Sequence, residues 1–417
     1  MRITILVVGS RGDVQPFVAL GLGLQAVGHQ VRLATHSTFA AFARSYGLEF
    51  FPIEGNPRDM LSGEKGQEWL ESGRNPLRFA RDGISILAPL LARLFADSWA
   101  ACQDAEAIIS ATFALAGPHI AEKLGIPSYV AYLQPISRTR AFPSMSISPG
   151  RNLGGPLNAL TYRASEQLFW QIVRQPVNRW RQESLNLPPI PFSGLFSQMA
   201  QQRRPILYAY SPSVLPKPAD WGDWIHVTGY WFLERQNGWQ PPDDLAGFLD
   251  DGPPPVYVGF GSMTPRDARE LAETAVTALQ KTGQRGILST GWGGLEQETL
   301  NLPDDVLVVD QAPHDWLFPR MAAVVHHGGA GTMAAGLRAG VPTVTVPFFF
   351  DQPFWGQQVA RLGAGPPPIP HKQITAVNLA AAIHRVVTDE RMRARAAELG
   401  RRIRAEDGVA TAVQRIK

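Results

Sequence analysis

The first fifty residues alternate between short apolar runs and segments with helical spacing of apolar positions. The runs predict strands and the segments between them predict helices, in the order Ile3–Val8, Gln15–Val27, Val31–Thr35, Phe39–Tyr46 and Glu49–Phe51. This order is typical of a parallel sheet covered by helices. Further strands are expected at Ala107–Ser110 and Ser128–Leu133, after an apolar helical stripe between Ile84 and Leu94.

A second alternation follows in the other half of the chain. Its predicted elements are the strand Val256–Phe260, the helix Ala268–Lys281 and the strands Gly286–Ser289, Val306–Val309, Ala323–His326 and Thr343–Val346. Residues 235–244 are polar, rich in turn formers and without periodicity, which is typical of a linker. We therefore expect two doubly wound α/β domains, at 1–240 and 241–390, and a helical segment at 391–417. Whether this segment packs back on the first domain is left open.

The segment 135–205 interrupts this regular pattern. It is rich in proline and glycine and carries many large apolar side chains, among them Phe142, Tyr162, Trp170 and Trp180. Two interpretations remain open, a helical excursion packed on its own domain or an apolar surface that faces a ligand or a membrane. The Arg-rich helix expected at Glu390–Arg404 is typical of a solvated face.

Composition narrows the possible functions. Hydrophobic residues make up 45% and charged residues 18% of the 417, which excludes a disordered chain. A net charge of +3 gives no indication of nucleic-acid binding. The one cysteine, Cys102, can form no internal disulfide, and no apolar run is long enough to span a bilayer. We expect a cytoplasmic protein, with peripheral membrane contact left open.

In open α/β sheets, ligands bind at the carboxyl ends of the strands. The loop Gly9–Asp13 follows the first predicted strand but lacks the spacing G-x-G-x-x-G, and the chain has no G-x-x-x-x-G-K-[ST] motif. These absences argue against a dinucleotide-dependent dehydrogenase and a P-loop NTPase.

The strongest local signal is the stretch Val324–Thr332, where a strand ends in two histidines and small residues open a helix. Small residues let a ligand approach the backbone, and the free N–H groups of a helix start attract an anion such as a diphosphate. For the glycines alone, an ordinary strand-to-helix turn is the better explanation. The histidines at the strand end need an anion or another polar partner, and they favour a phosphate.

A polar pair, Asp351 and Gln352, follows the next predicted strand in an aromatic setting. Carboxylate and amide groups there suit a sugar with several hydroxyls, because buried polar groups require partners. Capping of the following helix by Asp351 is the alternative.

Together these residues resemble the nucleotide-sugar-dependent glycosyltransferases of GT-B architecture, in particular the sterol 3-O-glucosyltransferases and, more distantly, bacterial enzymes that glycosylate antibiotics. The resemblance spans nearly the whole chain. It rests on the motifs at Gly9–Pro16, Tyr210–Pro212, Asp220–Trp221, Gly229–Leu233, Pro313–Leu317, His326–Thr332, Phe349–Trp355 and Gly363–Pro368.

The resemblance implies two Rossmann-like domains facing a cleft, with the acceptor on the first domain and UDP-glucose on the second. It implies no cofactor beyond this co-substrate, and because the sequence has no Asp-x-Asp motif to chelate a metal diphosphate, we expect no metal requirement. The residues implied in donor binding are Gly12, Ser262, Ala312, His326, Gly328, Gly329, Ala330, Gly331, Thr332, Asp351 and Gln352. Of these, His326 and the turn to Thr332 would hold the phosphates, Asp351 and Gln352 the glucose, and Ala312 the base.

Two positions depart from the pattern of the plant secondary-metabolite enzymes. Gln311 stands where a uracil-stacking tryptophan is expected, and Ala334 stands where a ribose-binding glutamate is expected. The choice between UDP and dTDP sugars therefore stays open.

Asp13 aligns with the catalytic histidine of the plant relatives, which predicts that its carboxylate accepts the proton of an attacking hydroxyl. Transfer would invert the anomeric centre. Capping of the helix Gln15–Val27 by Asp13 is the alternative and is compatible with catalysis. We expect an apolar acceptor of sterol or triterpenoid type. The alternatives are a glycosyltransferase of macrolides, flavonoids or other secondary metabolites and a catalytically silent nucleotide-sugar-binding protein.

Overall fold

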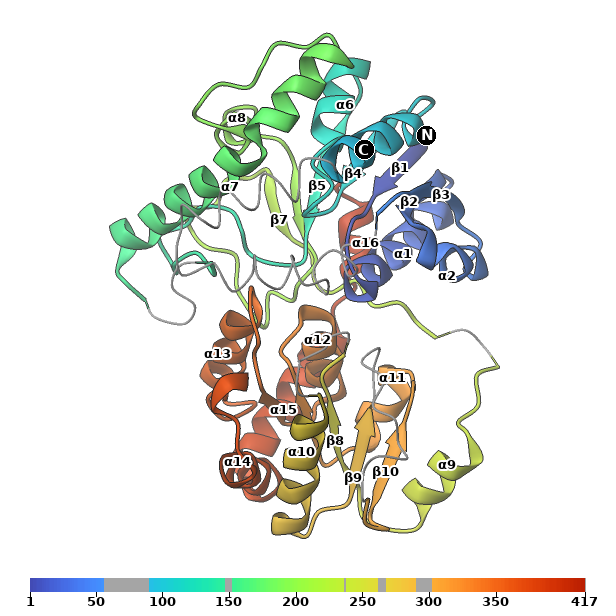
Figure 1. The fold of residues 1–417 in the computed structure, drawn as a ribbon, viewed down its shortest axis with the longest axis vertical. Coiled ribbons are helices and arrows are strands. Elements are labelled where there is room, and N and C mark those ends of the chain that lie inside the picture. Colours follow the sequence, from blue (N-terminus) through green and yellow to red (C-terminus); the bar gives the residue numbers. More distant parts are fainter. Residues whose placement is uncertain (56–89, 147–151, 236–237, 262–267, 290–301, 417) are drawn as a thin grey trace. The chain divides into compact units, whose positions relative to one another are not determined.

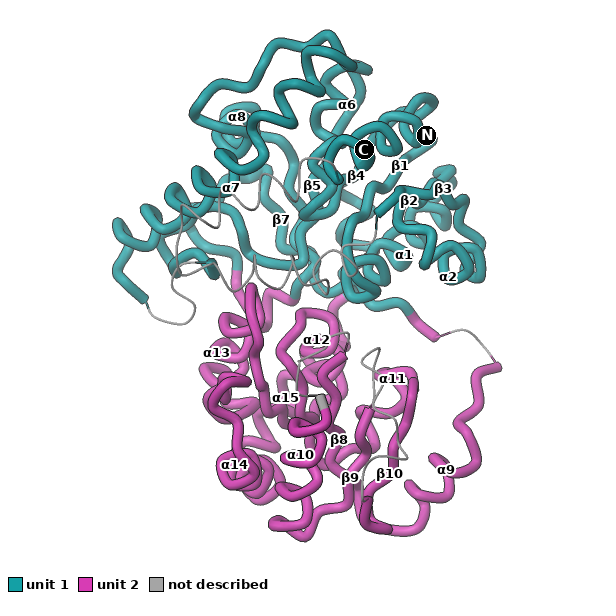
Figure 2. The backbone as a smooth tube through the Cα atoms, viewed as in Figure 1, with its two compact units in different colours: residues 1–210, 217–233, 407–417 teal, residues 211–216, 234–406 magenta. Residues whose placement is uncertain are grey.

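The computed structural model of the chain describes residues 1–55, 90–146, 152–235, 238–261, 268–289 and 302–416. They form two compact units (Figures 1 and 2). Unit 1 comprises residues 1–210, 217–233 and 407–417, and unit 2 comprises residues 211–216 and 234–406. The units therefore divide after Leu233 instead of near residue 240, and the expected segment 391–417 is split between them at residue 407.

Unit 1 contains a parallel sheet of seven strands in the order β3-β2-β1-β4-β5-β6-β7. The strands are β1 (Arg2–Leu6), β2 (Gln30–His36), β3 (Glu49–Ile53), β4 (Ala107–Ser110), β5 (Ser128–Tyr132), β6 (Ile206–Tyr208) and β7 (Ile225–Val227). The order reverses between β1 and β4, so the loop after β1 lies at the topological switch point where such sheets bind ligands. The sequence pattern predicted the first five strands but not β6 and β7, which are three residues long and too short to show a period.

Helices of unit 1 cover this sheet. They are α1 (Arg11–Ala26), α2 (Ala40–Ser45), α6 (Gly117–Leu124), α7 (Gly155–Glu183), α8 (Leu195–Gln201) and α16 (Gly408–Val413), and α16 packs against α1. The segment 135–205 thus contains the long helix α7. Only residues 90–94 of the predicted stripe from Ile84 to Leu94 are described, and they are helical.

Unit 2 contains a parallel sheet of five strands in the order β10-β9-β8-β11-β12. Its strands are β8 (Val256–Gly259), β9 (Gly286–Ser289), β10 (Val306–Val309), β11 (Ala323–His326) and β12 (Thr343–Thr345). Its helices are α9 (Asp243–Asp250), α10 (Ala268–Thr282), α11 (His314–Leu317), α12 (Ala330–Ala339), α13 (Gln352–Leu362), α14 (Ala376–Thr388) and α15 (Glu390–Arg404). The two sheets confirm the predicted α/β class with two parallel-sheet units.

Two apolar clusters lie on the strands of unit 2 and exclude water from its sheet. One joins the strands to α10 and α14 through residues such as Val325, Leu279 and Ile383, and the other includes Val324, Ile287 and Phe318. Neighbouring residues of β11 therefore pack into different clusters, as expected for a strand covered on both faces. This packing fixes the position of the turn that follows β11. Within the described ranges, no helix is long and apolar enough to cross a membrane.

Candidate active-site residues in each unit

The loop between β1 and α1 in unit 1 orients the carboxylate of Asp13. Ser10 is the N-cap of α1, and Asp13 is the third helical residue. Oδ2 of Asp13 accepts hydrogen bonds from the backbone N of Ser10 at 2.8 Å and from its Oγ at 2.9 Å. The helix therefore begins at Arg11, earlier than the predicted Gln15. Ser10 is its N-cap, so the alternative that Asp13 is the N-cap is wrong, although Asp13 takes part in the capping box by accepting from the backbone N of Ser10.

Gly9 makes room for this carboxylate. Its φ is +151°, and a Cβ at this position would lie 2.4 Å from Oδ2 of Asp13. The backbone N of Gly9 donates to Nε2 of the buried His36 at 3.3 Å. Burial raises the pKa of Asp13, and the two hydrogen bonds from Ser10 act in the opposite direction. The carboxylate of Asp13 is thus half-buried, fixed by Ser10 and a stronger base than a free aspartate. Its neighbour Gly12 is exposed.

In unit 2, His326 is the last residue of β11 and is fully buried. Its Nδ1 accepts a hydrogen bond from the backbone N of Gly328 at 2.9 Å, which places the ring proton of the neutral form on Nε2. Nε2 is buried and has no partner among the described residues. Burial lowers the pKa of His326 well below its usual value, and the neighbouring rings of His327 and His314 lower it further. His326 is therefore a neutral N–H donor and not a cation.

The ring of His327 packs beside the two glycine-containing loops at this sheet edge. Ideal Cβ atoms at Gly261 and Gly329 would lie 3.0 Å and 2.3 Å from atoms of the His327 ring. The residue is half-buried overall, but its Nδ1 is buried and finds no partner in the described part of the chain. Burial lowers the pKa of His327 to about 4. Both histidines of the motif are therefore neutral at pH 7.

The start of α12 presents free backbone donors. Gly329 is the N-cap and supplies no side-chain cap, and the backbone N–H groups of Ala330, Gly331 and Thr332 have no acceptor within the described ranges. Gly331 is exposed, and Ala330 and Thr332 are half-buried. The predicted anion site thus has backbone donors at the start of α12, and the strand that leads into the turn ends at His326, whose Nε2 has no partner among the described residues.

Gly328 links this turn to Asp351 and Gln352. Its φ is +88°, and a Cβ there would lie 3.1 Å from the backbone O of Gln352. The sequence-distant motifs at residues 326–332 and 351–352 are therefore brought together in unit 2.

The side chains of this polar pair are held by local hydrogen bonds. Oδ2 of Asp351 accepts from Nε1 of Trp355 at 3.0 Å, and Oε1 of Gln352 accepts from the backbone N of Phe348 at 2.8 Å. Asp351 is the N-cap of α13, as the alternative interpretation predicted, but its side chain makes no capping hydrogen bond. The preceding Phe350 has φ +57°, a strained value for a residue with a side chain. The carboxylate is thus oriented by Trp355, which the sequence interpretation did not single out.

The remaining predicted site residues lie elsewhere. Ala312 is half-buried and precedes α11, and Ser262 lies outside the described residues. His314, in α11, stacks on Phe318 with ring centroids 4.2 Å apart.

Two family models match the chain. Residues 3–143 match the Glycosyltransferase family 28 N-terminal domain, and residues 293–416 match the C-terminal domain of proteins like erythromycin biosynthesis protein CIII. The sterol 3-beta-glucosyltransferases of Neosartorya fischeri and Yarrowia lipolytica are each 41% identical to this chain over its full length. The chain corresponds to 29% and 28% of those relatives, so it spans less than a third of their length.

Solved structures support the fold. The glycotransferase of kitacinnamycin has a TM-score of 0.72 at 21% identity and covers 100% of this chain and 98% of its own. The glycosyltransferase VinC in complex with dTDP has a TM-score of 0.66 at 21% identity, with 99% and 98% of the two chains covered.

The two parallel sheets and these structural neighbours show that the chain has the fold of the GT-B glycosyltransferases. The two family models match its two ends, and its sequence is similar to that of the sterol 3-beta-glucosyltransferases along its whole length.

The neutral state of the histidines gives a testable pH dependence. We expect the ring ¹⁵N signals of His327 to report a neutral ring down to about pH 4, and those of His326 to titrate well below pH 6.5. Unfolded histidine titrates near pH 6.5, so the unfolded chain binds more protons below that pH. The free energy of unfolding of unit 2 should therefore fall as the pH drops from about 6.5 towards 4. A His327 ring that protonates near pH 6.5 in the folded protein would contradict this description.

Proposed function

We propose that this chain transfers glucose from UDP-glucose to the hydroxyl group of a sterol-type alcohol, with inversion at the anomeric carbon. The observation that carries this proposal is the 41% identity, over every part of the chain, to proteins named sterol 3-beta-glucosyltransferase. The residues of both units described above would supply the chemistry that such a transfer requires.

The donor part of the proposal rests on unit 2. The leaving group gains negative charge as the bond to glucose breaks, and prearranged N–H donors stabilise such charge without reorganising. The backbone N–H groups at the start of α12 and the Nε2–H of His326 are such donors. Asp351 and Gln352 would hold the glucose hydroxyls, because Trp355 and the turn at Phe348 fix their side chains nearby.

The acceptor part rests on Asp13 in unit 1. We propose that its carboxylate accepts the hydroxyl proton while the acceptor oxygen bonds to the anomeric carbon and UDP leaves with the bonding electrons. Burial raises the pKa of Asp13, which makes it a stronger base than a free carboxylate at the same pH. Ser10 holds Oδ2 in place. The proposed reaction needs no metal ion. Within the described residues, no cluster of three His, Cys, Asp or Glu side chains suits one.

A matrix of donors and acceptors tests this function. UDP-glucose and dTDP-glucose are each combined with a sterol, a triterpenoid, a flavonoid and a macrolide, and the glycosides are detected by mass spectrometry. We expect a product with UDP-glucose and the sterol or triterpenoid. The matrix includes dTDP-glucose because two of the structural neighbours are complexes with thymidine diphosphate.

Other outcomes of the matrix would replace the proposal. Product with the macrolide or flavonoid alone would assign the chain to secondary-metabolite transfer. Tight binding of a nucleotide sugar without turnover of any acceptor would indicate a silent binding protein.

Asp13→Asn separates catalysis from donor binding. The amide keeps the shape of the side chain but cannot take the proton, so we expect kcat to fall by about 10³-fold. The dissociation constant for UDP, measured by calorimetry, should stay unchanged because the residues proposed to hold the diphosphate lie in unit 2. Asp223→Asn, which alters an exposed carboxylate of unit 1, is the matched control and should keep full activity.

The converse variant, His326→Ala, should weaken UDP binding by about tenfold or more, because one hydrogen bond to a charged group is lost. Full turnover by Asp13→Asn would exclude Asp13 as the base.

A further inference from the structure

The segment 135–205 of unit 1 has an unbalanced charge. It contains nine arginines and two glutamates, whereas the whole chain has 39 basic and 36 acidic residues. Both glutamates have arginine partners. The buried Glu166 accepts from Nε of Arg138 at 2.6 Å, and Oε1 of Glu183 lies 3.7 Å from Nε of Arg179. Arg181 is buried and pairs with Glu122 of α6 at 2.8 Å, so it adds no charge to the surface. The exposed Arg140, Arg163, Arg179 and Arg203 and the half-buried Arg174 still outnumber the two glutamates of the segment, which therefore presents a net positive charge.

The first half of α7, within this segment, exposes an apolar stripe. Leu157, Leu160 and Leu168 are 55%, 56% and 40% exposed, and Ala164 between them is exposed too. Their spacing of three or four residues places them on one helix face. The opposite face is buried in unit 1 through residues such as Tyr162, Trp170, Val173 and Val177.

Arginines accompany the apolar side chains. Arg163 is exposed three residues after Leu160, which places it beside the stripe. The guanidinium of Arg174 lies 5.6 Å from the ring centre of Phe192, which is 64% exposed. Large exposed apolar side chains bordered by arginine are typical of surfaces that lie on anionic membranes.

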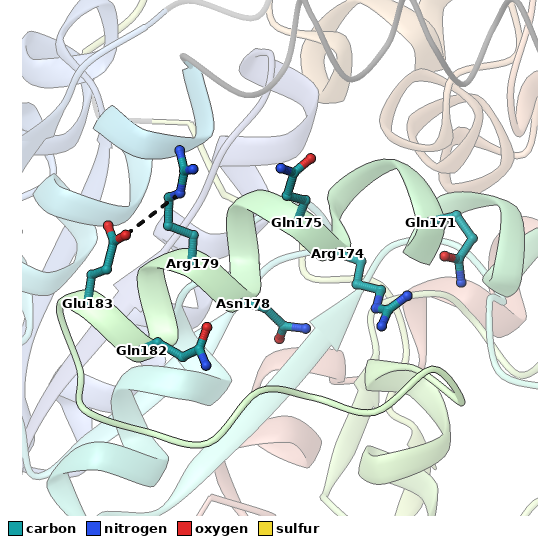
Figure 3. Close-up of a pocket in the computed structure, with 7 residues that line it drawn as sticks. All are labelled: Gln171, Arg174, Gln175, Asn178, Arg179, Gln182 and Glu183. Atoms are coloured by element: carbon teal, nitrogen blue, oxygen red, sulfur yellow. Dashed lines mark ion pairs between the residues drawn. The ribbon is translucent and has the colours of Figure 1, made fainter.

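The second half of α7 is different. Figure 3 shows a surface hollow along it that is lined by polar side chains, namely Gln171, Arg174, Gln175, Asn178, Arg179, Gln182 and Glu183. The helix thus changes from an apolar to a polar outer face near residue 170. A helix of this kind can insert its apolar end into the surface of a bilayer. No described helix is long and apolar enough to span one.

We propose that the stripe of Leu157, Leu160, Ala164 and Leu168, with Arg163 and Arg174, docks unit 1 on an anionic membrane surface. The leucines would enter the boundary between headgroups and acyl chains, and the arginines would pair with lipid phosphate and carboxylate groups. This inference rests on the proposed function and deepens it: a sterol acceptor resides in a bilayer, so an enzyme that glucosylates it has to reach the membrane surface. The positive charge of the segment favours an anionic lipid surface over a second copy of the chain, which would bring the same charges together.

Vesicle sedimentation tests the docking itself. We expect the full chain to bind phosphatidylcholine vesicles that contain phosphatidylserine, more weakly at high salt, and to bind pure phosphatidylcholine vesicles poorly. The double variant L157D/L160D should lower the binding by about tenfold or more, because it loses two apolar contacts and adds two negative charges. R163Q/R174Q should reduce binding only to the anionic vesicles.

The matched control is Val377→Asp, which places the same charge at a 70% exposed apolar position of α14 in unit 2. It should bind like the unaltered chain. Equal binding by L157D/L160D and the unaltered chain would overturn the proposal, and so would a change from dimer to monomer in that variant during sedimentation without vesicles.

Activity with one acceptor in two forms separates docking from acceptor binding. Cholesterol is offered in anionic vesicles or as a complex with cyclodextrin. We expect L157D/L160D to lose most glucosyl transfer to the vesicles and to keep it with the cyclodextrin complex. Equal loss in both forms would assign the stripe to the acceptor site or to folding and would overturn the proposal. If the unaltered chain transfers no glucose in either form, the proposed function fails, while the sedimentation result still decides the docking.

Discussion

The structure of the candidate donor site depends on one constraint, the approach of backbone to backbone at the turn between β11 and α12. Gly328 at φ +88° lets the chain pass within contact of Gln352. In the same turn, the backbone N–H of Gly328 donates to Nδ1 of His326, so the ring proton of His326 is on Nε2. One bend therefore joins the helix start, a neutral histidine donor and the polar pair of α13. A side chain at residue 328 would separate all three.

The rest of unit 2 keeps this turn in place. β11 is the fourth of five strands, so both of its edges are paired, and its side chains enter the two apolar clusters. α12 packs against α15, which the sequence interpretation treated as a solvated Arg-rich face. Helix α15 does expose its arginines, but it buries Met392, Ala396, Leu399 and Ile403. In unit 1 the corresponding constraint is Gly9, which admits the carboxylate of Asp13 beside the loop.

The sequence predicted those parts of the fold that a period can reveal. Ala107–Ser110, Gly286–Ser289, Val306–Val309, Ala323–His326 and the helix Glu390–Arg404 have the predicted bounds. The short strands β6 and β7 have too few residues to show a period. The sequence pattern also did not predict the 29 residues of α7 as one helix, because Pro176 lies inside it. At the site, residue types predicted a diphosphate turn and a polar pair. They could not predict the tautomer of His326, the partner Trp355 of Asp351 or the N-cap Ser10, because each depends on one side chain's position in space.

The central claim is that the turn before α12 receives a diphosphate. Backbone amide signals of Gly329, Ala330 and Gly331, followed by NMR while UDP is added, test it most directly. The account predicts that these three amides shift downfield and that their hydrogen exchange slows, because each N–H gains an acceptor. Saturable UDP binding that leaves these amides unchanged and shifts signals elsewhere would contradict it.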